Sequence, residues 1–239
     1  SIAAERQAPS VVISFFPPSK VVFGGGEFLS SVEEKLELLE PFSPTAVAVI
    51  PFSREYAQTD KRVFLDQLAR LEPAVIVVGE DFRFGHGRQG GLDDLRRITP
   101  ELEVFGLQSL GGEVVKSSAI RELLAAGEVA AAARLLGGEY LVMGEALPEP
   151  GGERLSVNVN PAKALPPGAF AVRVDDEAGS WGAVACVDQA TGDRFTLLPL
   201  DGSVGGEGRL LRVRFAARLQ SGTASGAELR EEAARILNE

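Results

Sequence analysis

Carboxylate, aromatic and basic side chains follow one another directly after an apolar run of the sequence. The side chains are Asp81, Phe82, Arg83 and Phe84, and the run is AVIVV at 74–78. An apolar run of this length is typical of a buried strand in a parallel sheet. Ligands of open α/β folds bind beyond the carboxyl ends of such strands. The sequence therefore predicts that this segment contacts a ligand; the alternative is a mobile, glycine-rich loop with a few charges.

A second candidate segment reads KSSAIREL at 116–123. Ser117 and Ser118 can cap a helix whose first amides carry partial positive charge. Arg121, one turn further on, adds a cation with a bidentate fork. Anions bind readily at helix N-termini, so the segment suggests a phosphate site. Taken alone, however, it fits an ordinary serine-capped helix with a solvated arginine better than it fits a phosphate site.

The elements that would position these residues alternate between apolar runs and helical patterns. Ser31 and Glu34 form a capping-box signal, followed by an apolar face of Val32, Leu36 and Leu39. Such alternation predicts a parallel sheet with crossover helices, an α/β fold of the Rossmann-like type. The apolar runs lie at 11–15, 46–50, 74–78 and 103–107, and a second helix is expected over 61–71.

The pattern changes after the Pro/Gly-rich segment PEPGGER at 148–154, which marks a boundary. Short β-like runs separated by turns follow, and the chain ends in a helix expected over 227–237. This spacing predicts a small, mostly antiparallel β-barrel. The runs lie at 155–159, 169–174, 182–187, 194–198 and 209–215. We therefore expect two domains, 1–145 and 146–239.

Composition narrows the classes of function. The 239 residues are 45% hydrophobic and 24% charged, as in a globular protein. A formal net charge of −10 argues against nucleic-acid binding by the general field. No apolar run approaches the roughly 20 residues that span a bilayer. The single cysteine, Cys186, fits a reducing cytoplasm, and the single histidine, His86, excludes mechanisms that need two histidines in this sequence.

The two candidate segments occur together with other motifs in a fixed order. VGEDFRFGHGRQG is followed by the Ser-Ser-x-Ile-Arg helix and AARLLGGEY, and it is preceded by VVISFFPPSKVVF and PFSREYAQTDKRVF. This ordered set resembles the prokaryotic bifunctional riboflavin kinase/FAD synthetase family. The resemblance covers most of residues 10–145.

The resemblance implies a nucleotidyltransferase that makes FAD. In such a reaction the phosphate of FMN attacks the α-phosphorus of ATP, giving FAD and pyrophosphate, usually with Mg²⁺ bound. The reaction asks the protein for positioning and charge stabilisation. The expected partners are therefore the small molecules FMN and ATP, without nucleic acid or membrane. The oligomeric state is left open.

The resemblance also implies roles for individual residues. Phe15, with Phe82 or Phe84, would shape the isoalloxazine pocket, and Asp81 would lie between nucleotide and flavin. Phosphates would be held by the helix at 117–121, with Arg121 and Ser118 acting in catalysis. No residue is assigned as a ligand of a protein-bound metal. The flavin- and ATP-binding set is thus Phe15, Asp81, Phe82, Phe84, Ser117, Ser118 and Arg121.

The sequence departs from the family's first signature. That signature is a Gly-x-Phe-Asp-Gly loop with a His-x-Gly-His pair that binds ATP phosphates. It would precede Ser1, so we expect the sequence to lack an N-terminal segment. His86 lies alone in another loop, where a solvent-facing turn residue is the simplest interpretation. Phe16 stands where the family usually has aspartate.

The second domain resembles the family's riboflavin kinase barrel only faintly. Of the Pro-Thr-Ala-Asn stretch that holds metal and nucleotide, LSVNV keeps only Ser156 and Asn158. Arg194, beside Asp193, stands near the position of the glutamate base. A phosphotransferase needs a base and a metal, and an arginine supplies neither. We therefore predict that kinase activity is weak or lost.

Two alternatives to an FAD-synthesising enzyme remain open at this point. The chain could be a degenerate homologue that binds FMN, FAD or ATP without turnover. Alternatively, the barrel could have a structural or regulatory role towards the first domain.

Overall fold

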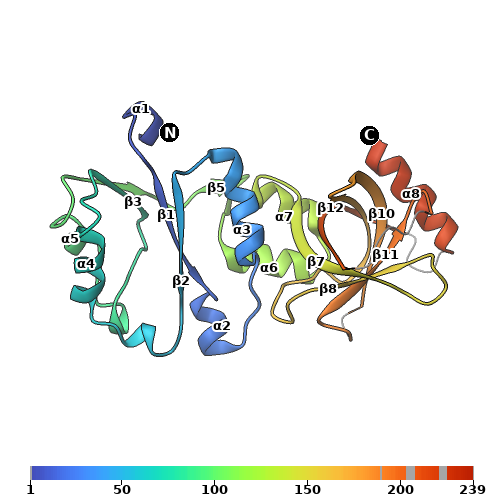
Figure 1. Cartoon of the computed structure of the whole chain (residues 1–239), viewed down its shortest axis with the longest axis horizontal. Helices are drawn as coiled ribbons and strands as arrows, with labels where there is room; N and C mark the ends of the chain where they lie inside the picture. The colour runs from blue at the N-terminus through green and yellow to red at the C-terminus, as the bar shows by residue number, and fades with distance from the viewer. Residues whose placement is uncertain (1, 189, 203–207, 221–224, 239) are drawn as a thin grey trace. The chain divides into compact units, whose positions relative to one another are not determined.

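The computed structural model of the chain describes residues 2–188, 190–202, 208–220 and 225–238 (Figure 1). It divides into two compact units, which are described separately. The first, called the α/β unit, comprises Ile13–Gly24 and Ala48–Val115. The second, called the barrel unit, comprises Ser1–Val12, Gly25–Val47 and Lys116–Glu239. The division at residue 145 drawn from sequence stays a prediction.

Four strands form two parallel pairs. β1 pairs with β2, and the hydrogen bonds Ala46 N to Ser10 O and Phe52 N to Phe16 O keep one offset, as parallel strands do. β3 pairs with β4 in parallel register. The parallel sheet expected from the four apolar runs is confirmed. The strands are β1 (Val11–Phe16), β2 (Ala46–Pro51), β3 (Val75–Gly79) and β4 (Glu101–Phe105).

Short helices connect and cover these strands. α4 (Lys61–Ala69) begins at Asp60, whose carboxylate accepts a hydrogen bond from Arg62 N. Its buried face presents Phe64, which packs with Phe84 and Leu95 in the core of the unit. The other elements here are α2 (Ser19–Gly24), η2 (Tyr56–Gln58), η3 (His86–Arg88), α5 (Leu92–Leu95) and the hairpin β5 (Ser109–Leu110) and β6 (Glu113–Val114).

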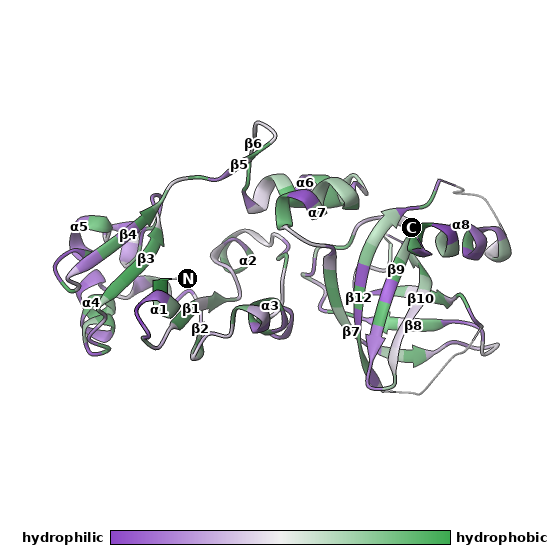
Figure 2. Cartoon of the chain, turned by 90° about the horizontal axis from the view of Figure 1, so that it is seen from above, coloured by the Kyte–Doolittle hydropathy of each residue, from purple (hydrophilic) through white to green (hydrophobic). Residues whose placement is uncertain are grey.

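The barrel unit contains a closed antiparallel barrel in the order β10-β11-β8-β7-β12-β9. Buried and partly exposed residues alternate along strands such as β12, and Figure 2 shows both hydrophobic and hydrophilic residues on the barrel strands. Five strands match the predicted runs, whereas β7 was not predicted. The strands are β7 (Tyr140–Pro148), β8 (Leu155–Asn158), β9 (Gly168–Asp176), β10 (Gly179–Val187), β11 (Arg194–Pro199) and β12 (Arg209–Arg218).

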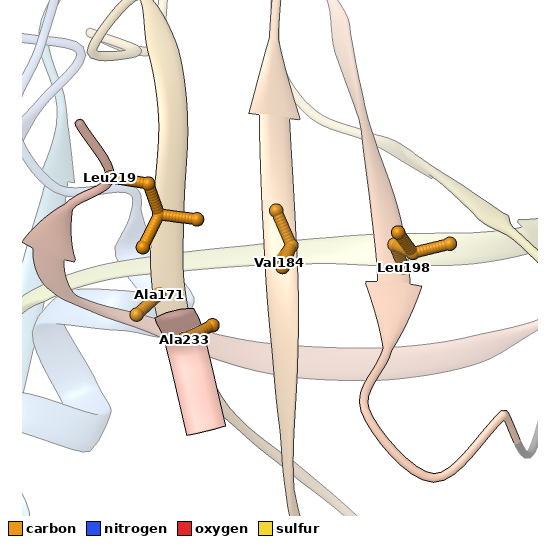
Figure 3. Packing of buried hydrophobic residues seen from close by; sticks show 5 residues of the cluster. All are labelled: Ala171, Val184, Leu198, Leu219 and Ala233. Carbon is orange, nitrogen blue, oxygen red and sulfur yellow. The ribbon is translucent and has the colours of Figure 1, made fainter. Parts of the chain in front are cut away.

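The predicted C-terminal helix is present as α8 (Gly226–Asn238) and packs against the outside of the barrel. Ala233 of α8 lies over Ala171 of β9 and Val184 of β10, beside Leu198 and Leu219 (Figure 3). The unit also contains α1 (Ile2–Glu5), α3 (Val32–Leu39), η1 (Glu40–Phe42), α6 (Ser117–Ala125) and α7 (Val129–Leu136). In the part of the chain described, no helix is long and apolar enough to cross a membrane.

Helix α3 is anchored to the barrel by a charge rather than by its apolar residues. The predicted capping box is present between Ser31 and Glu34. Glu34 is buried and accepts hydrogen bonds from Lys163 Nζ at 2.5 Å and from Met143 N at 2.8 Å. The expected apolar face is not the buried one, because Leu36 is exposed. The buried Glu34–Lys163 ion pair therefore joins α3 to the loop after β8. The hydrogen bond from Met143 N joins the same helix to β7.

Candidate functional site

An aromatic pocket of about 450 Å³ lies in the α/β unit. Its wall is formed at the carboxyl ends of β1, β2 and β3, where a ligand site of an open α/β sheet is expected. Helix α4 closes one side with Phe64. Seven aromatic side chains line the pocket: Phe15, Phe23, Phe52, Tyr56, Phe64, Phe82 and Phe84.

The rings support one another, so the pocket is formed before any ligand arrives. Phe15 has its ring centre 6.2 Å from those of Phe52 and Phe64. Phe84 lies 4.9 Å from Phe64 and 5.8 Å from Phe82. The rings are tilted or edge-on to one another, the arrangements that aromatic quadrupoles favour. The wall is therefore a packed aromatic cluster and not a set of independent side chains.

The loop that carries Phe82 and Phe84 is held against α4. Gly85 has φ +73°, and a Cβ there would lie 2.7 Å from Cα of Lys61. His86 N donates to Thr59 O at 2.8 Å. Lys61 Nζ bonds Asp94 at 3.0 Å, next to the end of the loop. Glycine is required at 85 both by the positive φ and by the close approach of the helix backbone.

The basic side chains of this loop lie at the edge of the pocket. Arg83, His86 and Arg88 all line it. Arg83 Nη1 donates to Phe82 O at 2.7 Å, which fixes the guanidinium near the aromatic wall. Arg83 belongs to the segment that the sequence predicted to contact a ligand, whereas His86 and Arg88 were not predicted to lie at the site. The position of His86 and Arg88 on the same loop as Phe82 and Phe84 could have indicated them.

Asp81 and Tyr56 contribute differently to this region. Asp81 is exposed and does not line the pocket, so its expected place beside the flavin stays a prediction. Tyr56 lines the pocket, and its buried hydroxyl has no hydrogen-bond partner among the described residues. Burial raises the pKa of Tyr56 above its usual value.

The second candidate segment lies in the barrel unit. Helix α6 begins at Ser117, and its N-cap is Lys116, which makes no side-chain cap hydrogen bond. Ser117 and Ser118 therefore lie in the first turn of the helix and not at the N-cap position that was expected for a serine. Arg121 is half-buried, and no hydrogen bond or ion pair engages its side chain within the described ranges. The structure thus groups Ser117, Ser118 and Arg121 on α6, and Phe15, Phe82 and Phe84 in the aromatic pocket.

The residues expected from the kinase resemblance lie in a second cavity, called the barrel cleft. It has a volume of about 700 Å³. Ser156 and Asn158 reach it from β8, and Arg194 lies opposite Asn158 on β11. Arg194 Nε lies 3.5 Å from Asp193 Oδ1. The barrel cleft is also lined by Leu147, Pro148, Glu149, Pro150, Val159 and Pro161.

Fold and site together define a two-part protein: an α/β unit with an aromatic pocket at its strand ends, and a closed six-stranded barrel. The family model described as FAD synthetase matches residues 1–119. A putative bifunctional riboflavin kinase/FMN adenylyltransferase of Geobacillus thermodenitrificans is 34% identical over 128 residues, 54% of this chain and 72% of the relative. The chain belongs to the bifunctional riboflavin kinase/FMN adenylyltransferase family.

Other relatives share less of their length with this chain. The bifunctional riboflavin kinase/FMN adenylyltransferase of Escherichia coli K12 is 30% identical over 149 residues, 59% of this chain and 48% of the relative. That of Haemophilus influenzae is 28% identical over 196 residues, 74% of this chain and 62% of the relative. The chain thus spans between about half and three quarters of the length of these three relatives.

A solved structure shows the same fold over nearly the whole chain. It is named as a macrolide-efflux protein from Streptococcus pneumoniae and has a TM-score of 0.78 at 19% identity. The match covers 99% of this chain and 84% of that one. At this identity the similarity concerns the fold alone.

Proposed function

We propose that this protein is an FMN adenylyltransferase, which transfers AMP from ATP to FMN and releases pyrophosphate. The observation that carries the proposal is the aromatic pocket at the carboxyl ends of the parallel strands. Its residues come from the region that the FAD synthetase family model matches. A flat heteroaromatic ring system is the ligand that such a wall suits best.

The pocket would bind the isoalloxazine ring by stacking and by exclusion of water. A cavity of about 450 Å³ falls within the ordinary range for small-molecule sites. Phe15, Phe82 and Phe84 supply ring faces and edges to a planar ligand. Because the rings already pack on one another, little side-chain freedom would be lost on binding.

Helix α6 is the proposed phosphate site. The amides of its first turn carry partial positive charge and have no carbonyl partner within the helix. Ser117, Ser118 and Arg121 would hold the phosphate oxygens as the FMN phosphate attacks the α-phosphorus and pyrophosphate leaves. Removing Arg121 is expected to cost about 2–4 kcal/mol of transition-state stabilisation.

The proposed Mg²⁺ would be held chiefly by the phosphates of ATP. Among the residues that the structure describes, no group of three or more His, Cys, Asp or Glu side chains could chelate a metal. Mg²⁺ usually binds through few protein ligands, several waters and substrate phosphates. When bound, it would neutralise charge on the nucleotide.

The two parallel strand pairs share one hydrophobic cluster without sharing backbone hydrogen bonds. Within the described residues, β1 pairs only with β2 and β3 only with β4. Yet Phe15 of β1 and Ile76 and Val78 of β3 pack on the same hydrophobic cluster. The aromatic wall proposed to bind the flavin therefore rests on side-chain packing between the two pairs.

We further propose that riboflavin kinase activity is weak or lost. Arg194 occupies the barrel cleft and lies close to Asp193. A guanidinium there cannot accept a proton from the riboflavin hydroxyl. Ser156 and Asn158 would remain as residual metal or nucleotide contacts. The barrel would then serve mainly to support the first part of the chain.

The setting we propose is a reducing cytoplasm with small-molecule partners. The single cysteine and the acidic composition support this setting and argue against nucleic-acid binding.

The test uses the full-length protein with FMN, ATP and Mg²⁺, with FAD measured by chromatography. We expect FAD above a no-enzyme control and strongly reduced FAD with Arg121→Gln. FMN binding without FAD formation would instead support the non-catalytic homologue. A parallel reaction with riboflavin and ATP should give little FMN; rapid FMN formation would overturn the kinase proposal.

A further inference from the structure

Three exposed residues with basic side chains line the aromatic pocket, and we call the part of the lining that they form its mouth. They are Arg83, His86 and Arg88, and all come from the loop that carries Phe82 and Phe84. The protein as a whole has a formal net charge of −10. The charge of the mouth is therefore opposite to the net charge of the chain, and the same pocket is lined by seven aromatic rings.

The loop holds these groups in place. Phe84 and Gly90 exchange two backbone hydrogen bonds, at 3.2 and 2.8 Å. His86 N is bonded to Thr59 O at 2.8 Å. Gly85 lies directly on the first residue of α4. The backbone of the loop is therefore held at defined points, so the side chains of Arg83 and Arg88 start from fixed positions beside the pocket.

Arg83 and Arg88 differ in what already occupies them. Arg83 donates from Nη1 to the carbonyl oxygens of Phe82 and Glu80, at 2.7 and 3.4 Å. These bonds orient the guanidinium and leave its other N–H groups available. The Arg88 side chain is exposed, and no hydrogen bond or ion pair holds it in the described part of the chain.

The backbone of Arg88 is in the left-handed region, with φ 59°. In the described ranges only Gln7, Ser43 and Glu72 share this feature among non-glycine residues. An L residue pays for this conformation in free energy, and such residues cluster at binding sites. Glycine would adopt the same turn at lower cost. Because glycine would be less costly at this position, we expect the side chain of Arg88 to have a function.

We propose that Arg83 and Arg88 form an anion subsite that makes the pocket prefer a flavin carrying a phosphate over an uncharged flavin. This inference rests on the proposed function, since it takes the ring system of the ligand to lie among the aromatic side chains. The phosphate monoester at the end of the ligand then meets two guanidinium groups at the mouth. Arginine binds phosphate oxygens through paired N–H donors.

The subsite would separate FMN from riboflavin by charge, because both share the same ring and differ in the terminal phosphate. Binding energy from the phosphate would also fix the orientation of the ligand. The nucleotide α-phosphate offers the same chemistry, so the experiment includes AMP as a competitor.

The test is a fluorescence titration of the full-length protein with FMN and with riboflavin. The wild type is expected to bind FMN at least tenfold more tightly than riboflavin. Arg88→Gln and Arg83→Gln should each weaken FMN binding about tenfold and leave riboflavin binding within twofold. Arg70→Gln, an exposed arginine of the same unit outside the pocket, is the matched control and should change neither.

Two further variants separate charge from loop conformation. Arg88→Gly removes the charge and suits the left-handed backbone, so it should fold and still lose the preference for FMN. Arg88→Lys should retain part of the preference. Added salt should weaken FMN binding in the wild type more than in Arg88→Gly.

Several outcomes would overturn the assignment. An unchanged FMN preference in both Arg88→Gly and Arg83→Gln would show that the phosphate is bound elsewhere. Equal weakening of FMN and riboflavin would show that the arginines maintain the pocket and not its selectivity. Displacement by AMP alone, with FMN unaffected by the variants, would assign the subsite to the nucleotide. Absence of binding of either flavin to the wild type would contradict the proposed function itself.

Discussion

The aromatic pocket and the barrel cleft differ in the residues that line them and in the elements that supply those residues. The pocket is lined by seven aromatic rings from strand β1, from helices and from loops near the carboxyl ends of parallel strands, and basic residues also line it. The cleft lies along outward-facing residues of β8 and β11 and is lined by prolines and charged or polar side chains. The first is a packed aromatic wall, which we propose as the site for a flat ligand. The second has no aromatic side chain among its described lining residues, and its carboxylates are those of Glu149 and Asp193.

The two units also place their buried groups differently. The interior of the barrel is filled by side chains such as Phe170, Phe195 and Phe215, so it is a packed core. The barrel unit buries an ion pair, Lys163 with Glu34, to hold α3. The α/β unit also contains a buried carboxylate, Asp94, but its partner Lys61 is partly exposed, and the basic residues Arg83 and Arg88 line the pocket. Changes in the barrel unit should therefore act on stability, and changes at the pocket should act mainly on ligand binding.

The largest effect is expected from Lys163→Met in the barrel unit. The substitution leaves the carboxylate of Glu34 buried without its counter-ion, where both side chains are at most 2% exposed. Removing one partner of a buried pair costs about 3–5 kcal/mol. Urea unfolding measures this loss. The double variant Lys163→Met/Glu34→Gln also removes the buried negative charge of Glu34, so it should recover part of the lost stability.

A surface ion pair provides the control. Arg96 and Asp93 lie 2.5 Å apart, with side chains 55% and 90% exposed. Arg96→Met should cost less than about 1 kcal/mol, because solvent screens exposed charges. Equal effects of the two substitutions would show that burial does not set the importance of the Lys163 pair.

In the α/β unit, Gly85→Ala should disturb the pocket. A Cβ at this position would lie 2.7 Å from the backbone of Lys61, and φ is +73°. We expect a loss of about 2–4 kcal/mol in stability, together with weaker FMN binding as the loop moves. Gly87→Ala has a similar φ of +63° but no neighbour closer than 3.9 Å. This control should lose only about 1 kcal/mol.

Much of the fold follows from local patterns in the sequence. Apolar runs correctly indicated the strands of the parallel pairs and five barrel strands, because burial on one or both faces leaves a local signature. Phe82 and Phe84 were expected near a ligand because they follow a strand end, whereas Phe15 was assigned to the site through the resemblance to the family. Strand β7 was missed, since Tyr140–Glu145 lies before the Pro/Gly-rich boundary.

Long-range pairings could not be predicted in this way. Glu34 has a local role in the capping box, which gave no sign that it also meets a lysine 129 residues away. Its burial reverses the expected face of α3, with Leu36 exposed instead. Phe52 and Tyr56 lie in the PFSREYAQTDKRVF segment, but no role in the site was predicted for them; their position after a predicted strand could have indicated the pocket. Packing between segments that are distant in the sequence determines which face of α3 is buried and which side chains line the pocket.

The buried lysine should also give the barrel unit a pH dependence that the pocket lacks. Burial lowers the pKa of Lys163 from 10.5 to about 8. Between these values the unfolded chain binds more protons than the folded one, so the free energy of unfolding rises with pH. The slope is at most about 1.4 kcal/mol per pH unit. Unfolding curves of wild type and Lys163→Met at pH 7.5 to 9.5 isolate this contribution; parallel profiles would contradict it.

The smallest effects should come from the chain's two tyrosines, one in each region. The hydroxyl of Tyr140 is buried in the barrel unit, donates to Ala164 O at 2.7 Å and lies 3.1 Å from Leu29 O. Tyr140→Phe should cost about 1–2 kcal/mol, because buried carbonyl groups lose a donor.

Tyr56→Phe should have the opposite sign. The hydroxyl of Tyr56 is buried beside the pocket and has no partner among the described residues. Removing it relieves an unpaired polar group, so stability should rise by up to about 1 kcal/mol. Thermal unfolding of the two variants gives the comparison directly. A loss in Tyr56→Phe as large as that in Tyr140→Phe would mean that this hydroxyl is paired in the folded protein, and the aromatic wall would then depend on polar contacts as the barrel unit does.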